Sequence, residues 1–180
     1  MRFFINARAW QLLLFIVGIP MAGMLWYVVL FMPTAESTVL EIVMLAASLW
    51  MNAFLITWVL ATVTGLHDEI RSLSLGGSLA LFKVAIGFLY FVLLLFSLVV
   101  GLLSSINDLP DTILNLLNVL VLVGIADYFY IVAFAARTIV KAEQVKVKFS
   151  EYFKTFLQIM FFPIGIWFVQ PRINKIALKR

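Results

Sequence analysis

Residues 84–104 read VAIGFLYFVLLLFSLVVGLLS, an apolar run without a charged side chain. An α-helix rises about 1.5 Å per residue, so about 20 residues cross the roughly 30 Å hydrocarbon core of a bilayer. Three further runs of similar length occupy residues 9–32, 39–64 and 112–136. The sequence therefore predicts an all-α integral membrane protein, a four-helix bundle whose neighbouring spans are antiparallel because their connections are short.

The composition supports the same class. Hydrophobic residues make up 64% of the chain and charged residues 12%, which is typical of a protein solvated by lipid. The longest polar stretch is far shorter than the ~50 residues of an independent domain. We therefore expect a four-span bundle over residues 1–142 and a cytoplasmic, amphipathic or interfacial segment over residues 143–180.

Basic residues fall on one side of the membrane when the four runs are threaded across it. The thirteen Lys and Arg residues lie near the N-terminus, around the connection between the second and third runs, and after the fourth run. The other two connections carry only acidic charges. Since cytoplasmic loops are rich in Lys and Arg, both termini are expected in the cytoplasm. Attraction to anionic lipid headgroups then explains the net charge of +4, without nucleic acid as a partner.

The first run resembles a secretory signal peptide, because two arginines precede an apolar stretch. At residues 9–32 it is longer than the roughly 7 to 15 apolar residues of a signal peptide, so we interpret it as a transmembrane helix. Pro20 removes a backbone donor near its middle and is predicted to kink the helix. Gly76 and Gly77, in the connection at residues 65–78, are predicted to form a hinge.

A fifth apolar run, residues 153–169, is interrupted by Pro163 and Gly165. A crossing would place the closing Lys and Arg residues outside, so we predict an interfacial or re-entrant helix. A fifth span is the alternative that the length of the run allows. Pro171 is expected to end this helix. The residues expected at the lipid headgroups are Lys154, Trp167, Arg172 and Lys175.

One acidic residue, Asp127, lies well inside a predicted span. An ionised side chain in lipid costs ~2.5 to 3.5 kcal/mol on insertion scales, so Asp127 is expected to face the bundle interior and find a donor. Thr57 and Tyr90 are candidate donors. Asp127 is interpreted either as a proton- or cation-binding carboxylate, or as a member of an interhelical hydrogen bond that fixes packing.

Three asparagines are the other polar candidates within the spans. Asn52 lies at a depth that matches Asp127. Asn115 and Asn118 lie toward the outer end of the fourth span, where they project about 60° apart, with Asn118 roughly opposite Asp127. Asparagines of this kind hold helices together, as do small residues such as Ala46 and Gly124. The small residues favour association between helices.

No constellation typical of an enzyme occurs. His67 adjoins Asp68 and Glu69, but a zinc site on a helix uses ligands at i and i+4, not adjacent ones. His67 is interpreted as part of a solvated helix end. The absence of cysteine excludes disulfides and thiolate metal sites. We expect no enzymatic activity, no cofactor and no metal site.

The closing stretch FFPIGIWFVQPRINKI, residues 161–176, is similar to the endings of small bacterial multi-span membrane proteins. This resemblance implies a bacterial inner (plasma) membrane. The leading hypothesis is a non-enzymatic oligomeric subunit that acts as a membrane anchor, scaffold or pore component. The alternative is a small proton- or ion-coupled transporter that uses Asp127, with Asn52 and Pro20 in the same pathway.

Overall fold

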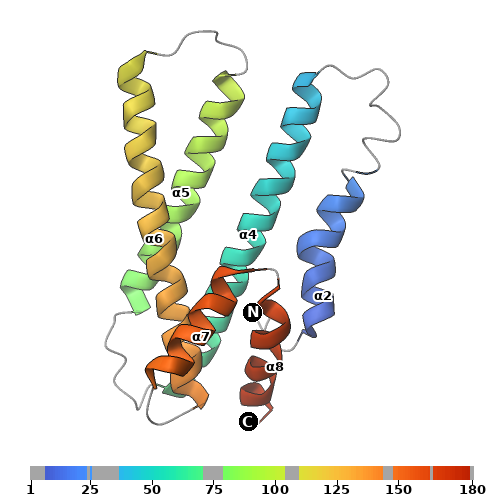
Figure 1. The fold of residues 1–180 in the computed structure, drawn as a ribbon, viewed down its shortest axis with the longest axis vertical. Coiled ribbons are helices and arrows are strands. Elements are labelled where there is room, and N and C mark those ends of the chain that lie inside the picture. Colours follow the sequence, from blue (N-terminus) through green and yellow to red (C-terminus); the bar gives the residue numbers. More distant parts are fainter. Residues whose placement is uncertain are drawn as a thin grey trace.

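The structure is a computed structural model that describes residues 7–23, 25, 37–70, 79–103, 110–143, 148–162 and 164–178. Every regular element among these residues is helical, as predicted. Three long helices stand side by side (Figure 1): α4 (Ser37–Ile70), α5 (Leu79–Leu103) and α6 (Asp111–Glu143). Shorter helices flank them on one side and at one end.

Three segments are long and apolar enough to cross a membrane: Leu45–His67, Leu79–Val99 and Asn115–Glu143. They correspond to the predicted second, third and fourth spans. The helices continue beyond the predicted limits, because α4 reaches Ile70 where a turn was expected from Gly65, and α6 reaches Glu143. A helix satisfies its own backbone hydrogen bonds in lipid and in water, so the end of an apolar run does not end the helix.

The first predicted span is described in part. Its described residues form one apolar helix, Ala9–Gly23, which is shorter than a span. This helix begins as α2 (Ala9–Leu13) and passes into a π-helical turn, η1 (Leu14–Gly18). Residues 24 and 26–32 lie outside the described part of the chain.

The π-helical turn accommodates Pro20. The Ile19 amide donates to the Leu14 carbonyl, five residues earlier. The next bond in this pattern would run from residue 20 to the Phe15 carbonyl, but proline has no N–H. Trp50 of α4 supplies a donor instead, with its Nε1 3.1 Å from the Phe15 carbonyl oxygen. The backbone hydrogen bond that Pro20 cannot donate is therefore replaced by a wider helical turn and a side-chain hydrogen bond from the neighbouring helix.

The helices α4, α5 and α6 pack against one another, and the core extends from between them to α2, α7 and α8. Its largest side chains are less than 2% exposed and include Trp58, Leu66, Phe82, Ile131 and Ile139. The Phe82 and Phe134 rings stack with their centroids 4.7 Å apart, which joins α5 to α6. The outer face of α5 is apolar and exposed, as a lipid-facing surface must be.

Two short helices cover one end of the long ones (Figure 1). α7 (Phe149–Met160) packs against α6, and α8 (Ile166–Ala177) packs against α2 and α7. Each has twelve residues, which is too short for a span. The break between them falls where Pro163 and Gly165 predicted an interruption, although Pro163 itself lies outside the described residues.

The prediction that Pro171 ends its helix is wrong. α8 runs through Pro171 and ends at Ala177. A proline inside a helix removes one backbone hydrogen bond and crowds the carbonyl four residues earlier. Here the neighbours Gln170 and Arg172 both make side-chain hydrogen bonds to other segments, and these contacts hold α8 in place on either side of the proline.

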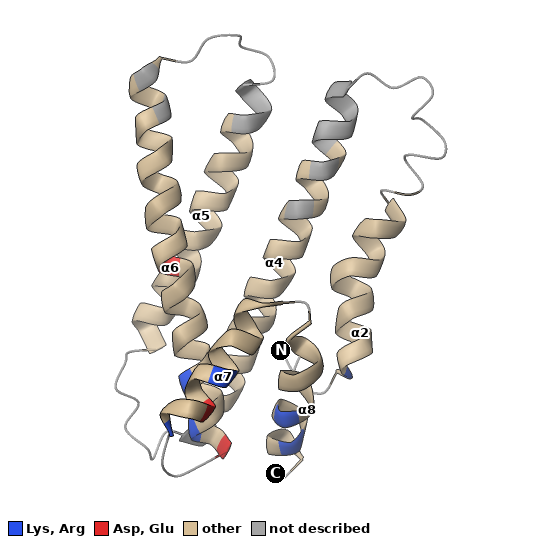
Figure 2. Cartoon of the chain, in the orientation of Figure 1, with Lys and Arg blue, Asp and Glu red and all other residues tan. Residues whose placement is uncertain are grey.

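The Lys and Arg residues gather at the end of the bundle where α7 and α8 lie (Figure 2). We call this the basic end. From α6 onward its described Lys and Arg residues are Arg137, Lys141, Lys148, Lys154, Arg172 and Lys175. The acidic connections expected on the opposite side fall on residues whose side chains lie outside the described part.

A substitution at Gly165 tests whether α7 and α8 approach each other closely. An added Cβ at this position would lie 1.4 Å from the Gln158 carbonyl oxygen. We expect Gly165→Ala to lower the free energy of unfolding by about 1–3 kcal/mol, because the turn must open. Gly87→Ala is the matched control, since its Cβ meets nothing within 4 Å and its helix propensity improves. Unfolding in mixed micelles, followed by circular dichroism, measures both; equal stabilities would contradict the packing.

Candidate functional site

A cavity of about 360 Å³ lies between α4, α5 and α6. Its wall is almost entirely apolar, with the Asn52 amide and the Tyr128 phenol as its polar side chains. The lining residues are Asn52, Leu55, Ile56, Leu89, Val92, Leu93, Phe96, Val121, Gly124, Ile125 and Tyr128. Cavities between the helices of a bundle are common places for apolar ligands.

Gly124 sets the approach of α5 and α6 beside this cavity. An added Cβ on Gly124 would lie 3.1 Å from Val92 Cγ1, which is tighter than ordinary van der Waals contact. The small residue therefore allows the two helices to come close, as small residues do in membrane bundles. Gly124 was among the small residues that the sequence indicated for helix association.

Asp127 lies midway along α6, one residue before Tyr128, and is not a lining residue of the cavity. Among the described residues, its Oδ2 atom is buried and has no hydrogen-bond partner. A buried carboxyl oxygen without a donor is unfavourable in lipid. Among the described acidic side chains, Asp127 therefore has a buried oxygen atom without a donor.

Thr57 and Tyr90, the predicted hydrogen-bond donors to Asp127, contact other groups. The Thr57 hydroxyl oxygen lies 2.7 Å from the Tyr90 hydroxyl oxygen, and both lie within 2.8 Å of the Ala53 carbonyl oxygen. The two hydroxyl protons are shared among these three contacts. The group joins α4 to α5 in the middle of the bundle, and it satisfies two hydroxyls that would otherwise be buried in lipid.

Asn115 and Asn118 are exposed on the outer half of α6 and do not line the cavity. The structure thus brings Asn52 to the cavity and Asp127 beside it, while the other two asparagines face outward. Pro20 lines a separate groove of about 410 Å³ between the first helix and α4. Gly76 and Gly77 lie outside the described residues.

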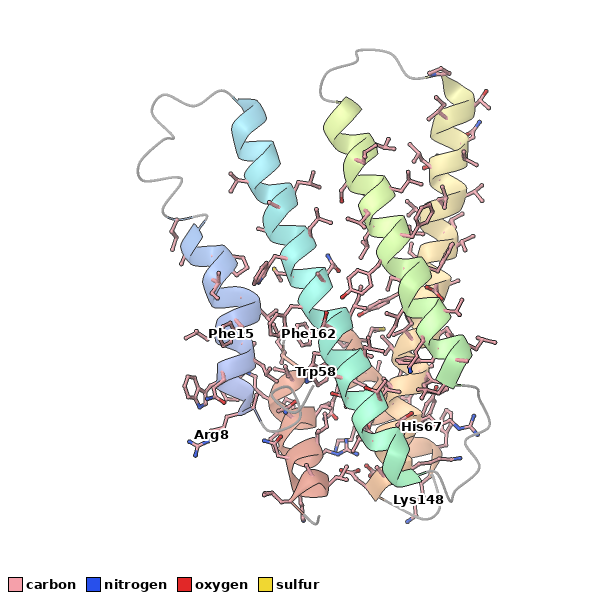
Figure 3. The ribbon with its side chains drawn as sticks, turned by 180° about the vertical axis from the view of Figure 1, so that it is seen from behind. Arg8, Phe15, Trp58, His67, Lys148 and Phe162 are labelled. Carbon is pink, nitrogen blue, oxygen red and sulfur yellow. The ribbon has the colours of Figure 1, made fainter. Side chains whose placement is uncertain are left out.

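At the basic end, fully buried Gln170 joins α8 to two distant segments. Its Oε1 accepts a hydrogen bond from Trp58 Nε1 of α4 at 2.9 Å, and its Nε2 donates to the Ala7 carbonyl at 3.0 Å. Asn174 contacts both of these residues: its Oδ1 accepts a hydrogen bond from Gln170 Nε2, and its Nδ2 donates one to the Ala7 carbonyl. We call these four residues the Gln170 cluster. Trp58 also packs against Phe162, with ring centroids 5.9 Å apart (Figure 3).

Arg172 organises the other side of α8. Its guanidinium forms an ion pair with Glu143 at the end of α6, where both side chains are about one-fifth exposed. Its Nη1 donates to Thr155 Oγ1 at 2.9 Å and to Gln158 Oε1 at 3.3 Å, both on α7. We call these four residues the Arg172 cluster. The hydrogen bond to Glu143 raises the pKa of the Arg172 guanidinium above its usual range, against a smaller opposing effect of burial.

The headgroup residues predicted from sequence are therefore of two kinds. Arg172 was expected to meet lipid phosphates, whereas the structure gives its guanidinium protein partners on α6 and α7. Lys154, Trp167 and Lys175 are exposed on α7 and α8, which leaves them available to headgroups.

Sequence reasoning missed the Gln170 cluster. Gln170 is the one polar residue between Ile164 and Pro171, and Asn174 follows four residues later on the same helical face. That pattern was a usable signal for a buried amide pair. Its partners, Trp58 and the Ala7 carbonyl, are more than a hundred residues away, so no local pattern identifies them.

Comparison of the chain with protein-family models, with curated proteins and with solved structures gives no match.

Gln170→Met tests the Gln170 cluster, because it keeps the volume and removes the hydrogen bonds. We expect the free energy of unfolding to fall by about 2–3 kcal/mol, since the Trp58 indole N–H loses its acceptor in a buried site. Lys175→Met on the exposed face of α8 is the matched control and should stay within about 0.5 kcal/mol of wild type. An equal change in both variants, measured by denaturant unfolding in micelles, would assign the effect to the methionine and not to the cluster.

Proposed function

We propose that this protein is a non-enzymatic subunit of an oligomer or membrane complex, acting as an anchor, scaffold or pore component of a bacterial inner membrane. In this proposal the first helix is a fourth span, the four helices form one bundle, and both termini lie in the cytoplasm. The positions of the described basic residues support this orientation, since Lys and Arg mark the cytoplasmic side.

The main support for this proposal is the exposure of the outer half of α6. Most described positions there are exposed, including Leu116, Val119, Leu122 and Val123, while Leu117 and Leu120 are half-buried. Little of the described part of the chain covers these positions of α6. A helix with an uncovered half has room for a neighbouring helix from a second copy or from another protein.

Two exposed amides favour a protein neighbour over lipid alone. Asn118 lies about 28 Å along the helix from Arg137, so with Arg137 at the inner edge it falls inside a ~30 Å core. Lipid tails offer an amide no hydrogen-bond partner, whereas a second helix does. Asn115 lies about 60° around the helix from Asn118, so the two amides share one outward side.

Single-cysteine cross-linking tests this proposal directly, because the chain has no native cysteine. We expect Asn118→Cys to form a disulfide-linked dimer on mild oxidation in native membranes. Leu98→Cys on α5 is a control at matched depth. On the antiparallel helices α5 and α6, Val92 faces Gly124 and Phe82 faces Phe134. Six residues beyond Val92 on α5 and six residues before Gly124 on α6 therefore reach the same depth, at Leu98 and Asn118. Leu98 is 60% exposed on α5. Equal cross-linking of both variants would indicate random collision.

The mass of the assembly in lipid nanodiscs decides between a homo-oligomer and a mixed complex. A whole-number multiple of the 20.4 kDa chain supports the first, and one copy bound to another membrane protein supports the second. A strictly monomeric chain without a bound protein would contradict the proposal.

A second candidate function is proton- or ion-coupled transport through Asp127. The buried Oδ2 atom without a described partner supports it. So does its depth, since Asp127 lies about 15 Å along α6 from Arg137 and therefore near the middle of the core. A carboxyl at that depth is a candidate for reversible protonation.

Asp127→Asn distinguishes the two candidates, because it keeps the shape and removes the titration. If Asp127 couples transport, reconstituted wild type should carry protons into liposomes under a membrane potential, and Asp127→Asn should lose this flux while its unfolding changes by less than about 1 kcal/mol. Glu151→Gln neutralises an acid on α7 and should leave the flux unchanged. A wild type without flux, or a variant that retains it, would exclude the transport role of Asp127.

A further inference from the structure

A second cavity, of about 400 Å³, lies at the basic end between α6 and α7. Two cations on α6, Arg137 and Lys141, form one wall, and two aromatic rings on α7, Phe149 and Tyr152, form the other. Arg137 and Lys141 are one helical turn apart, about 6 Å along the axis, so their side chains share a face. Two adjacent cations in one cavity are suited to an anion with several oxygen atoms.

Two described acidic side chains of this end interact with Arg172. Glu143, two residues after Lys141, forms the ion pair with Arg172 on the α8 side. Glu151 on α7 also acts electrostatically on Arg172. The negative charge of these two residues is thus directed toward α8.

An aromatic surface leads from this cavity toward the middle of the bundle. The Phe149 and Phe153 rings stack at 6.0 Å, the Phe153 and Phe156 rings at 6.4 Å, and Phe156 stacks on Phe129 of α6 at 6.2 Å. Phe129 lies about 12 Å along α6 from Arg137. Phe149, Phe153 and Phe129 are 77%, 48% and 45% exposed, so this row of rings forms a continuous apolar surface.

We propose that this cavity binds the phosphate headgroup of an anionic phospholipid, with Arg137 and Lys141 on the phosphate oxygens and an acyl chain along the aromatic row. Basic pockets at the cytoplasmic ends of spans are suited to anionic headgroups. A free phosphate compound shares the headgroup chemistry, but it makes no use of the aromatic row. The row therefore favours the lipid. This inference does not depend on whether the protein is a subunit or a transporter.

Native mass spectrometry of the purified chain, titrated with phosphatidylglycerol or phosphatidylcholine, tests the site. We expect wild type to retain phosphatidylglycerol in preference to phosphatidylcholine. The double variant Arg137→Gln, Lys141→Gln should weaken the retention of phosphatidylglycerol roughly 25-fold, from a factor of about five for each basic residue. The matched control, Arg8→Gln with Lys83→Gln, removes the same charge from exposed positions outside the cavity. It should stay within about twofold of wild type.

Three outcomes would overturn the proposal. Equal losses in the two double variants would indicate general surface charge. Displacement of the lipid by glycerol 1-phosphate at equal concentration would indicate a free phosphate ligand. Phe153→Ala with unchanged lipid retention would show that the aromatic row plays no part. Helical circular dichroism checks folding, and Arg137→Gln alone, at an exposed position, replaces the double variant if that variant does not fold.

Discussion

Lipid offers no hydrogen-bond partners, and this constraint governs both the backbone and the side chains of the structure. It restricts the described chain to helices, whose backbone groups pair within each segment. It also explains how isolated polar groups are placed. The hydroxyls of Thr57 and Tyr90 share the Ala53 carbonyl, and the Trp50 indole reaches a carbonyl of the π-helical turn beside Pro20. The Tyr90 and Trp50 contacts each join two helices, so satisfying polar groups also sets the packing.

Hydrogen bonds between buried polar side chains are concentrated at the basic end. The Gln170 cluster joins α8 to α4 and to the chain before α2, while the Arg172 cluster joins α8 to α6 and α7. Both depend on one short helix, which therefore links the first helix to the rest of the bundle. Replacing every partner of a buried polar contact by apolar groups can be nearly neutral, whereas removing one partner leaves the others unpaired and is costly. Such contacts therefore restrict the geometry to one arrangement.

The outer half of the bundle is organised differently. Its helices expose apolar side chains on several sides, and the described polar groups there are not drawn into clusters within the chain. Asn118 faces outward on α6, and Asp127 carries a buried oxygen without a described partner. The basic end thus gathers Gln170, Arg172 and their partners into clusters, while Asn118 and Asp127, farther along α6, are groups suited to a neighbour or a proton. This contrast motivates both candidate functions.

The sequence by itself determined the all-α class, three of the spans, the gathering of basic residues and the break between α7 and α8. Length, hydropathy and charge decide these features, and all three are local properties of the chain. Only the tertiary structure decided that Arg172 binds Glu143, that Pro171 lies inside a helix, and that Gln170 reaches Trp58 and Ala7. These outcomes depend on which segments meet in space, and contacts between segments that are distant along the chain, 29 positions for Arg172 and Glu143 and more than a hundred for Gln170 and its partners Trp58 and Ala7, leave no periodic pattern in the sequence.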